Sequence, residues 1–286
     1  MSALKFGCQL PQDTSDVNRI FEVTRQCEDL GFDSVWTYDH LAPYWLHPPT
    51  SLESWTLLAA IAARTSKIRI GSLVTNVNFR NPAFLAKMAS TVDNISGGRL
   101  IVGLGAGDRM SANELRAHGY RFPGLNERIL RLRETIMILR GLWAGEEMSF
   151  RGSIFNVSKA ICLPTPIQSQ GPPIWVGGRH RKVVEVAAEL ADGWNCWGIT
   201  GERLTEMERH LVVKCQLLER DPRTIIKSWA GTLRSSSSKS PKIMESMKAE
   251  LMSHISKETD YVIGSFPASS DRKTYEAFAD AVRCLS

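Results

Sequence analysis

Short apolar runs typical of β-strands alternate along this chain with segments whose apolar residues recur every 3.6 positions, as in helices. The runs that predict strands cover residues 4–10, 34–38, 68–74, 99–104, 174–176, 193–196 and 224–230. Alternation at this spacing indicates parallel strands joined by crossover helices. Length allows two small domains or one parallel barrel, and the sustained alternation favours a single α/β domain, a (β/α)8 TIM barrel over residues 1–286.

The end of the chain fits this barrel less well. A bare barrel needs about 250 residues. Residues 108–125 look like a long polar loop, and residues 146–165 contain a hairpin-like insertion. The segment 232–286 is weakly patterned, and the chain stops about where a last strand is expected to begin. We therefore predict that the last strand and helix are missing or degenerate, which would leave unpaired strand edges.

Composition excludes several classes of protein. The net charge is +5, with no run of five like charges, so a nucleic-acid interface is not indicated. The six cysteines form no C-x-x-C pair and predict reduced thiols rather than disulfides or metal ligands. No signal peptide precedes the first strand, and the longest apolar stretch, residues 55–63, is too short to cross a bilayer. We expect a cytoplasmic protein that binds neither nucleic acid nor membranes.

Asp39 and His40 follow the predicted strand 34–38. In a parallel barrel, side chains at the carboxyl ends of the strands line the active site. A histidine there can stabilise developing charge or transfer a proton near neutral pH. The alternative is that Asp39 caps a turn and His40 is a buried residue with satisfied hydrogen bonds.

The segment Gly103-Leu104-Gly105-Ala106-Gly107-Asp108 superficially suggests a dinucleotide fingerprint. That fingerprint needs glycine at position 108 and a helix directly afterwards, and this sequence has neither. A close approach of the backbone to a flat ligand explains the glycines better. Asp108 and Glu114 then lie just beyond Gly107 as candidate acid–base groups.

Gly177 and Gly178 end the strand 174–176, and Arg179 follows just before a predicted helix. Backbone N–H groups at a helix N-terminus, with a cation beside them, can bind a phosphate. The alternative is an ordinary tight turn between a strand and a helix.

Taken in order, these motifs resemble those of the bacterial luciferase-like superfamily, specifically its coenzyme F420-dependent oxidoreductases, including members similar to methylenetetrahydromethanopterin reductase. The resemblance covers roughly residues 4–231. It rests on Phe6-Gly7, Leu30-Gly31-Phe32-Asp33-Ser34-Val35-Trp36, Asp39-His40, Phe79-Arg80-Asn81-Pro82, Gly97-Gly98-Arg99-Leu100, Gly103-Leu104-Gly105-Ala106-Gly107-Asp108, Ile174-Trp175-Val176-Gly177-Gly178 and Ala191-Asp192-Gly193-Trp194. Each motif is weak singly, and together they are specific for the superfamily.

The resemblance implies a barrel that holds a deazaflavin at its C-terminal mouth. A non-proline cis peptide behind the coenzyme would fall at Ser72-Leu73, and Thr75 would contact the ring system. Gly177 and Gly178 would hold the phosphate, and Asp39 and His40 would lie beside the deazaflavin. Asp108 matches an acidic proton donor, and Trp45 matches an aromatic residue that flanks the substrate. Relatives of this kind are commonly homodimers.

The activity implied is hydride transfer between F420 and a small organic substrate, at a CH–NH, CH–OH or C=C group. His40 would stabilise charge in the transition state, and Asp108 or Glu114 would manage a proton. A pterin, an alcohol or an unsaturated carbonyl fits, whereas the lysines that would clamp a sugar phosphate are not evident at matching places. Two alternatives stay open: an FMN-dependent monooxygenase of the same superfamily, and a non-catalytic flavin-binding or degenerate barrel.

Overall fold

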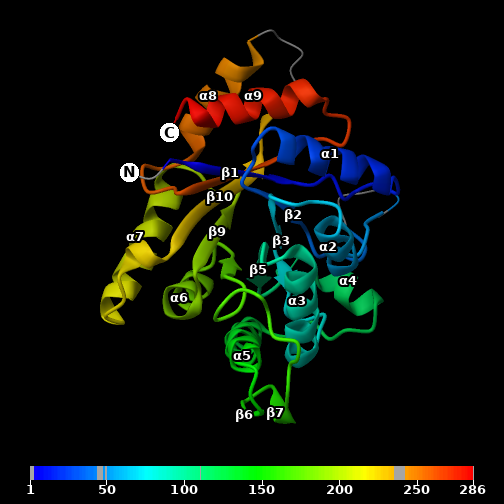
Figure 1. Cartoon of the computed structure of the whole chain (residues 1–286). Coiled ribbons are helices and arrows are strands. Elements are labelled where there is room, and N and C mark those ends of the chain that lie inside the picture. The colour runs from blue at the N-terminus through cyan, green and yellow to red at the C-terminus, as the bar shows by residue number, and fades with distance from the viewer. Residues whose placement is uncertain (1–2, 44–47, 49, 110, 235–241, 286) are drawn as a thin grey trace.

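A computed structural model describes residues 3–43, 48, 50–109, 111–234 and 242–285. Within them, eight parallel strands close into a barrel, because β3 pairs with both β2 and β5 (Figure 1). In chain order these strands are β1 (Lys5–Gln9), β2 (Ser34–Thr37), β3 (Arg69–Ser72), β5 (Leu100–Gly105), β8 (Ile174–Gly177), β9 (Gly193–Trp197), β10 (Ile226–Thr232) and β11 (Tyr261–Ser265). The short β4 (Thr75–Asn76) follows β3 and also pairs with β5. The predicted barrel is confirmed.

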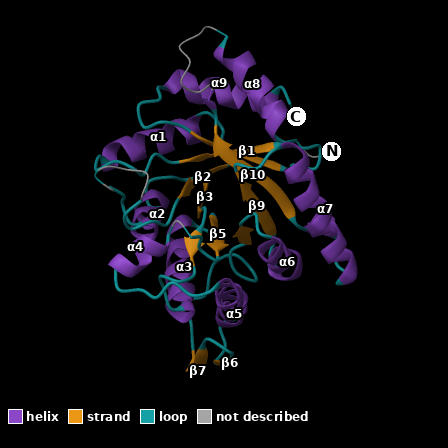
Figure 2. Ribbon diagram, turned by 180° about the vertical axis from the view of Figure 1, so that it is seen from behind, coloured by secondary structure: helices purple, strands orange, loops and turns teal. Residues whose placement is uncertain are grey.

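Helices surround the strands on the outside (Figure 2). One helix follows each barrel strand: α1 (Val17–Asp29), α2 (Ser54–Ala62), α3 (Pro82–Ser96), α5 (Leu125–Trp143), α6 (Arg181–Leu190), α7 (Gly201–Leu217), α8 (Ile243–His254) and α9 (Arg272–Arg283). Local sequence sets several of their ends. Asn81 caps α3 by accepting the N–H of Ala83, Pro82 occupies the first turn, and Gly97 ends the helix with φ +67°.

The expected missing strand is present, so that prediction is wrong. β11 pairs in parallel with β10 on one side and with β1 on the other, which closes the barrel. α9 follows it as the last helix, and β10 connects to β11 through α8 and loops. Tyr261–Ser265 is only five residues long, and its first four residues are all buried. In the sequence such a strand looks the same as any short apolar run, which is why it was not recognised.

Two segments interrupt the repeat between β5 and β8. β6 (Met148–Arg151) and β7 (Asn156–Ala160) form an antiparallel hairpin that projects beyond α5 (Figure 1). The segment 108–125, expected as a loop, contains a further helix, α4 (Ala112–Ala117). Six residues are too few to produce a visible helical period, which is why the sequence did not reveal it. α4 lies beside α2 and α3 in both views.

Two tryptophans fill the interior of the barrel. The rings of Trp36 and Trp175 lie 5.0 Å apart between centroids, and both side chains are buried. Glycines on neighbouring strands make room for them: a Cβ at Gly71 would come within 2.6 Å of Trp36, and one at Gly193 within 2.7 Å of Trp175. The barrel is thus a packed core rather than a pore.

Two further observations concern the whole chain. Among the described residues, no helix is both long enough and apolar enough to span a membrane. All six cysteines carry free thiols, and five of them are buried.

Candidate active site

The polar residues singled out from the sequence gather at the carboxyl-terminal mouth of the barrel. Parallel pairing brings the ends of all the strands to one side, so segments distant in sequence become neighbours. Asp39 and His40 follow β2, Thr75 and Asn76 form β4, and Gly107 follows β5. Gly177 ends β8 and Gln9 ends β1.

Asp39 is held in the wall of this mouth by Arg80. The two guanidinium nitrogens of Arg80 lie 2.6 and 2.9 Å from the two carboxylate oxygens of Asp39, and the N–H of Asn76 donates to the same carboxylate at 2.9 Å. Arg80 also bonds Glu53 Oε1 at 2.5 Å. Burial raises the pKa of Asp39, and Arg80 and the Asn76 N–H oppose this effect. Both carboxylate oxygens are engaged within the protein.

Sequence reasoning did not name Arg80 as a site residue. Its segment, residues 75–82, was interpreted as a polar loop at the mouth, and Phe79-Arg80-Asn81-Pro82 within it was part of the family pattern. One signal was available in the sequence. Asp39 was expected at a buried strand end, a buried carboxylate needs a cation as partner, and Arg80 lies in the loop at the same mouth.

His40 and Glu114 form a pair across the mouth. Nδ1 of His40 lies 2.8 Å from Oε2 of Glu114, and the other carboxylate oxygen accepts the backbone N–H groups of Leu41 and, at 2.8 Å, Ala42. The Glu114 side chain is 3% exposed and that of His40 23%. Burial acts to raise the pKa of Glu114, but the bonds from His40 and the backbone outweigh it and lower the pKa below 4.5. An ionised carboxylate therefore fixes the orientation of the imidazole.

Asp108 occupies a different environment from Glu114. It is exposed, and its Oδ1 accepts the N–H and the Oγ–H of Ser111, each at 2.9 Å. Arg128, from the first turn of α5, donates to the carbonyl of the adjacent Gly107. Of the two candidate acids, one is buried beneath the imidazole and the other faces solvent on a loop.

Gly103 and Gly105 make room for protein rather than for a ligand. A Cβ at Gly103 would overlap the carbonyl oxygen of Ser72, and a Cβ at Gly105 would overlap the side chain of Val74. A Cβ at Gly177 would lie 2.5 Å from the same Val74. The expected close approach is thus an approach of β5 and β8 to the end of β3.

The predicted cis peptide is displaced by one residue. The non-proline cis bond joins Leu73 to Val74, not Ser72 to Leu73. Ser72 is buried with its hydroxyl 3.4 Å from that of Ser54 on α2, so it faces the helices. Leu73 packs in the inner cluster with Trp36 and Trp175.

The turn after β8 is partly explained by packing. The N–H of Gly178 donates to the Asn195 carbonyl at 3.0 Å, and a Cβ there would lie 2.9 Å from Val183 on α6. The Arg179 side chain is exposed and bonds no described residue. Lys182, in the first turn of α6, reaches Asn126 at 2.7 Å. Arg179 and Lys182 therefore place positive charge at the start of α6. The N–H of Gly178, however, already donates to a protein carbonyl and is not available to a phosphate.

Three buried polar atoms around the mouth have no hydrogen-bond partner among the described residues: Gln9 Oε1, Asn78 Oδ1 and Arg128 Nε. Thr75 is buried and accepts the indole N–H of Trp55 at 3.1 Å. Unpaired buried polar groups are costly, so their concentration here fits a polar ligand such as a deazaflavin. Trp45, predicted to flank the substrate, lies outside the described residues.

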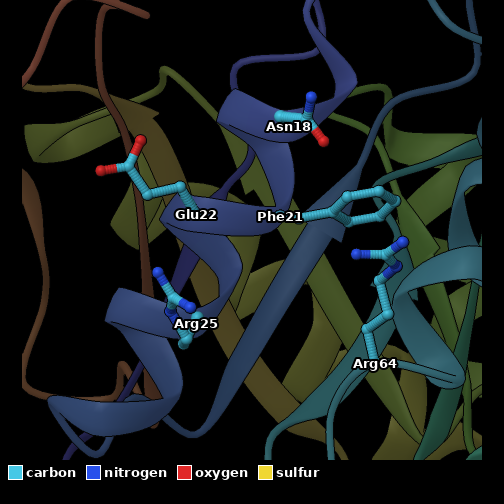
Figure 3. A pocket seen from close by; sticks show the side chains of 5 residues that line it. All are labelled: Asn18, Phe21, Glu22, Arg25 and Arg64. Carbon is cyan, nitrogen blue, oxygen red and sulfur yellow. The ribbon is translucent and has the colours of Figure 1, made fainter.

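A surface groove of about 360 Å³ lies away from the mouth (Figure 3). Asn18, Phe21, Glu22 and Arg25 of α1 line it together with Arg64, whose guanidinium stands 4.2 Å from the centroid of the Phe21 ring. None of the predicted site residues borders this groove.

Comparison with known proteins places this geometry in context. The model of the luciferase-like monooxygenase family matches residues 2–223. An F420-dependent glucose-6-phosphate dehydrogenase from Amycolatopsis mediterranei is 32% identical over 204 residues, which is 70% of this chain and 60% of that protein. One from Gordonia bronchialis is 31% identical over 225 residues, 76% of this chain and 64% of that protein. The chain thus spans about 60% of the length of such relatives.

Two solved structures share the fold. An F420-dependent secondary alcohol dehydrogenase in complex with an F420-acetone adduct superposes with a TM-score of 0.80 at 18% identity, covering 98% of both chains. The coenzyme F420-dependent tetrahydromethanopterin reductase from Methanopyrus kandleri superposes with a TM-score of 0.78 at 19% identity, covering 97% of this chain and 98% of that one.

Proposed function

The chain belongs to the luciferase-like monooxygenase family, and from that premise we propose that it is an F420-dependent oxidoreductase acting on a small organic substrate. The observation that carries the proposal is the His40–Glu114 pair, 2.8 Å apart, at the mouth of a closed barrel. The F420-dependent names of the relatives from Amycolatopsis and Gordonia support the choice of coenzyme. The closed barrel removes the reason for considering a degenerate, non-catalytic protein.

F420, when bound, supplies a ring that exchanges a hydride with a substrate carbon. The residues we assign to holding it are Thr75, Gly107, Asn78 and Arg128 at the mouth and Arg179 at the start of α6. Gly177 and Gly178 form the turn that brings Arg179 there. Asp39 acts through Arg80 and Asn76: it holds the end of β2 against β4 and thereby positions His40.

His40 is the group we assign to the proton. When an alcohol or amine is oxidised, its O–H or N–H proton leaves as the C–H hydride leaves, so a base is needed next to the reacting carbon. Glu114 holds Nδ1, and this contact fixes the imidazole at the mouth, where it would meet the substrate. Asp108, exposed on its loop, would act as a second acid–base group. Trp45 would flank the substrate.

The substrate class we propose is an alcohol, a pterin or an unsaturated carbonyl compound. The relatives are named for glucose 6-phosphate, but lysines that would clamp its phosphate are not evident at matching places in this chain. Glucose 6-phosphate therefore belongs in any substrate panel, and its turnover would contradict this part of the proposal.

The test is a pair of titrations followed by turnover. Fluorescence quenching should detect saturable binding of F420. In absorbance assays, an alcohol substrate should reduce oxidised F420, whereas an unsaturated carbonyl substrate should oxidise reduced F420. Micromolar binding of FMN together with no binding of F420 would replace the proposal with an FMN-dependent monooxygenase. The matched variants are His40→Ala, expected to lose turnover, and Arg64→Ala in the groove of Figure 3, expected to keep it.

We further propose a cytoplasmic homodimer. The free thiols, five of them buried, support a reducing compartment. The segment 161–167 lies along α3, where Lys87 bonds the Leu163 carbonyl, and leaves Phe84, Leu163 and Ile167 each more than half exposed. Sedimentation of the wild type and of Leu163→Asp tests this surface: a monomeric wild type would contradict the dimer.

A further inference from the structure

The side chain of Gln12 replaces a missing step in the pairing of β1 with β2. The two strands are parallel neighbours (Figure 1), and beyond β1 the Leu10 N–H still donates to the Trp36 carbonyl at 2.8 Å. In a parallel ladder the next bond would run from the Gln12 N–H to the Tyr38 carbonyl. That N–H instead donates to the Leu10 carbonyl at 2.9 Å, so the main chain leaves the ladder at this point.

The amide group of Gln12 makes the bonds that the main chain does not. Its Nε2 donates to the Tyr38 carbonyl and its Oε1 accepts the Tyr38 N–H, each at 2.9 Å. A carboxamide offers a donor and an acceptor, as a peptide group does, so one side chain can engage both backbone groups of a single residue. Nε2 also donates to the carbonyl of Leu52, which precedes Glu53, the N-cap residue of α2. Gln12 therefore joins the loop after β1 to the end of β2 and to the start of α2.

These bonds are made out of contact with water. Gln12 is fully buried, and both its oxygen and its nitrogen have partners. An apolar side chain in its place would leave the N–H and the carbonyl of Tyr38 without these partners, which is costly for buried groups. The backbone of Tyr38 would then move toward other partners or toward water. The position in which β2 ends thus depends on Gln12.

The end of β2 determines where the imidazole of His40 lies. Tyr38 precedes His40 by two residues, and the two rings meet edge to face with centroids 5.8 Å apart. Glu114, which bonds Nδ1 of the imidazole at 2.8 Å, comes from α4, a different part of the barrel rim. A shift of the end of β2 would therefore move His40 relative to Glu114. Misplacing a reacting group by about 1 Å can cost about 10²-fold in rate.

We propose that Gln12 is a positioning residue that acts on His40 through Tyr38. The inference rests on the proposed function, in which His40 takes the proton. Among the described residues, the side-chain hydrogen bonds of Gln12 go to Tyr38 and Leu52 and not to the residues that we assign to the coenzyme. Its loss should therefore lower the rate of the reaction and leave the affinity for F420 unchanged.

Gln12→Met tests this role, because it keeps the length of the side chain and removes its donor and its acceptor. Single-turnover measurements of hydride transfer should give a rate lower by about tenfold or more, with an unchanged Kd for F420. Gln216→Met, at an exposed position in the last turn of α7, is the matched control and should change neither quantity. A wild-type rate in folded Gln12→Met would overturn the proposal.

A double-mutant cycle separates positioning of His40 from a general structural role. In the His40→Ala background, Gln12→Met should lower the residual rate much less than it does when His40 is present, because residues that act as a unit are not additive. The same fold-reduction in both backgrounds would contradict action through His40. If circular dichroism finds Gln12→Met unfolded, Gln12→Glu decides by the same cycle, because a carboxylate keeps the acceptor for the Tyr38 N–H and loses only the donor.

A measurement without coenzyme or substrate distinguishes this inference from the proposed function. The NMR signals of the His40 ring, identified by their absence from His40→Ala, should shift in Gln12→Met and stay in place in Gln216→Met. Unshifted His40 signals in Gln12→Met would rule out the role of Gln12. Shifted signals in a protein that binds no F420 would support Gln12 as the residue that positions His40 and would contradict only the choice of coenzyme.

Discussion

Nδ1 of His40 lies 2.8 Å from Oε2 of Glu114, although 74 positions separate the two residues in sequence. The carboxylate also accepts the N–H groups of Leu41 and Ala42, so one buried side chain fixes both the imidazole and the backbone that follows it. Glu114 was predicted as a candidate acid–base group, and from these contacts we propose that it acts by positioning His40.

Glu114→Gln should lower kcat by about tenfold or more and change KM less, because it removes the charge that orients His40 but leaves the substrate contacts in place. The measurement is the pH dependence of kcat, which should differ between the variant and the wild type. Glu22→Gln on the outer face of α1 is the matched control. A lower rate with an unchanged pH profile would mean that Glu114 is only structural.

The same carboxylate should make stability depend on acid pH. Its pKa in the folded protein lies below the value of 4.5 that it takes when unfolded. The unfolded chain therefore binds the proton first as pH falls, and the stabilisation is present above about pH 4.5 and lost as pH falls through the folded pKa. Denaturant unfolding of wild type and Glu114→Gln between pH 7 and 3 measures this. A difference between them that stays constant with pH would contradict it.

Asp108→Asn should reduce turnover without reducing stability. Asp108 is exposed, and an asparagine oxygen can still accept the two bonds from Ser111. Removing a proton-transfer group costs about 10²–10⁴-fold in rate. Asp280→Asn on α9 is an exposed control. A wild-type rate in Asp108→Asn would remove Asp108 from the mechanism.

Arg80→Met should destabilise the fold by about 3–5 kcal/mol, because it leaves the buried Asp39 carboxylate without its cation. Asp39 is 4% exposed, so water cannot replace the lost partner. Thermal or denaturant unfolding measures the loss, and Asp39→Asn combined with Arg80→Met should recover part of it. Arg223→Met, which breaks an exposed pair with Asp221, is the control and should leave the unfolding midpoint nearly unchanged.

Gly103→Ala should destabilise by about 1–3 kcal/mol or more, because the added methyl group meets the backbone carbonyl of Ser72, which has little room to move. Gly124→Ala is the matched control: its φ is −63° and no atom lies within 4 Å of the added Cβ. Equal unfolding midpoints for the two variants would contradict the prediction, because they would mean that the Ser72 carbonyl moves aside at little cost.

The arrangement of the barrel was largely predictable from the sequence. Burial of a strand or a helix face leaves a local period in the chain, so seven strands could be placed from the order of apolar residues. The eighth strand could not, because Tyr261–Ser265 has no feature that distinguishes it until β1 and β10 are present on either side. The short α4 was missed for a similar reason: its six residues are too few to show a period.

Because parallel strands all finish on the same side of a barrel, the order of strands in the chain was enough to predict that Asp39, His40, Asp108 and Glu114 lie at its mouth. Their partners became known only from the folded chain. Asp39 pairs with Arg80, His40 with Glu114, and Gly103 and Gly105 with the end of β3. The period of apolar residues indicates whether a side chain is buried. Which residue that side chain contacts depends on strand register and on the position of a short helix such as α4. Neither property leaves a local pattern in the chain.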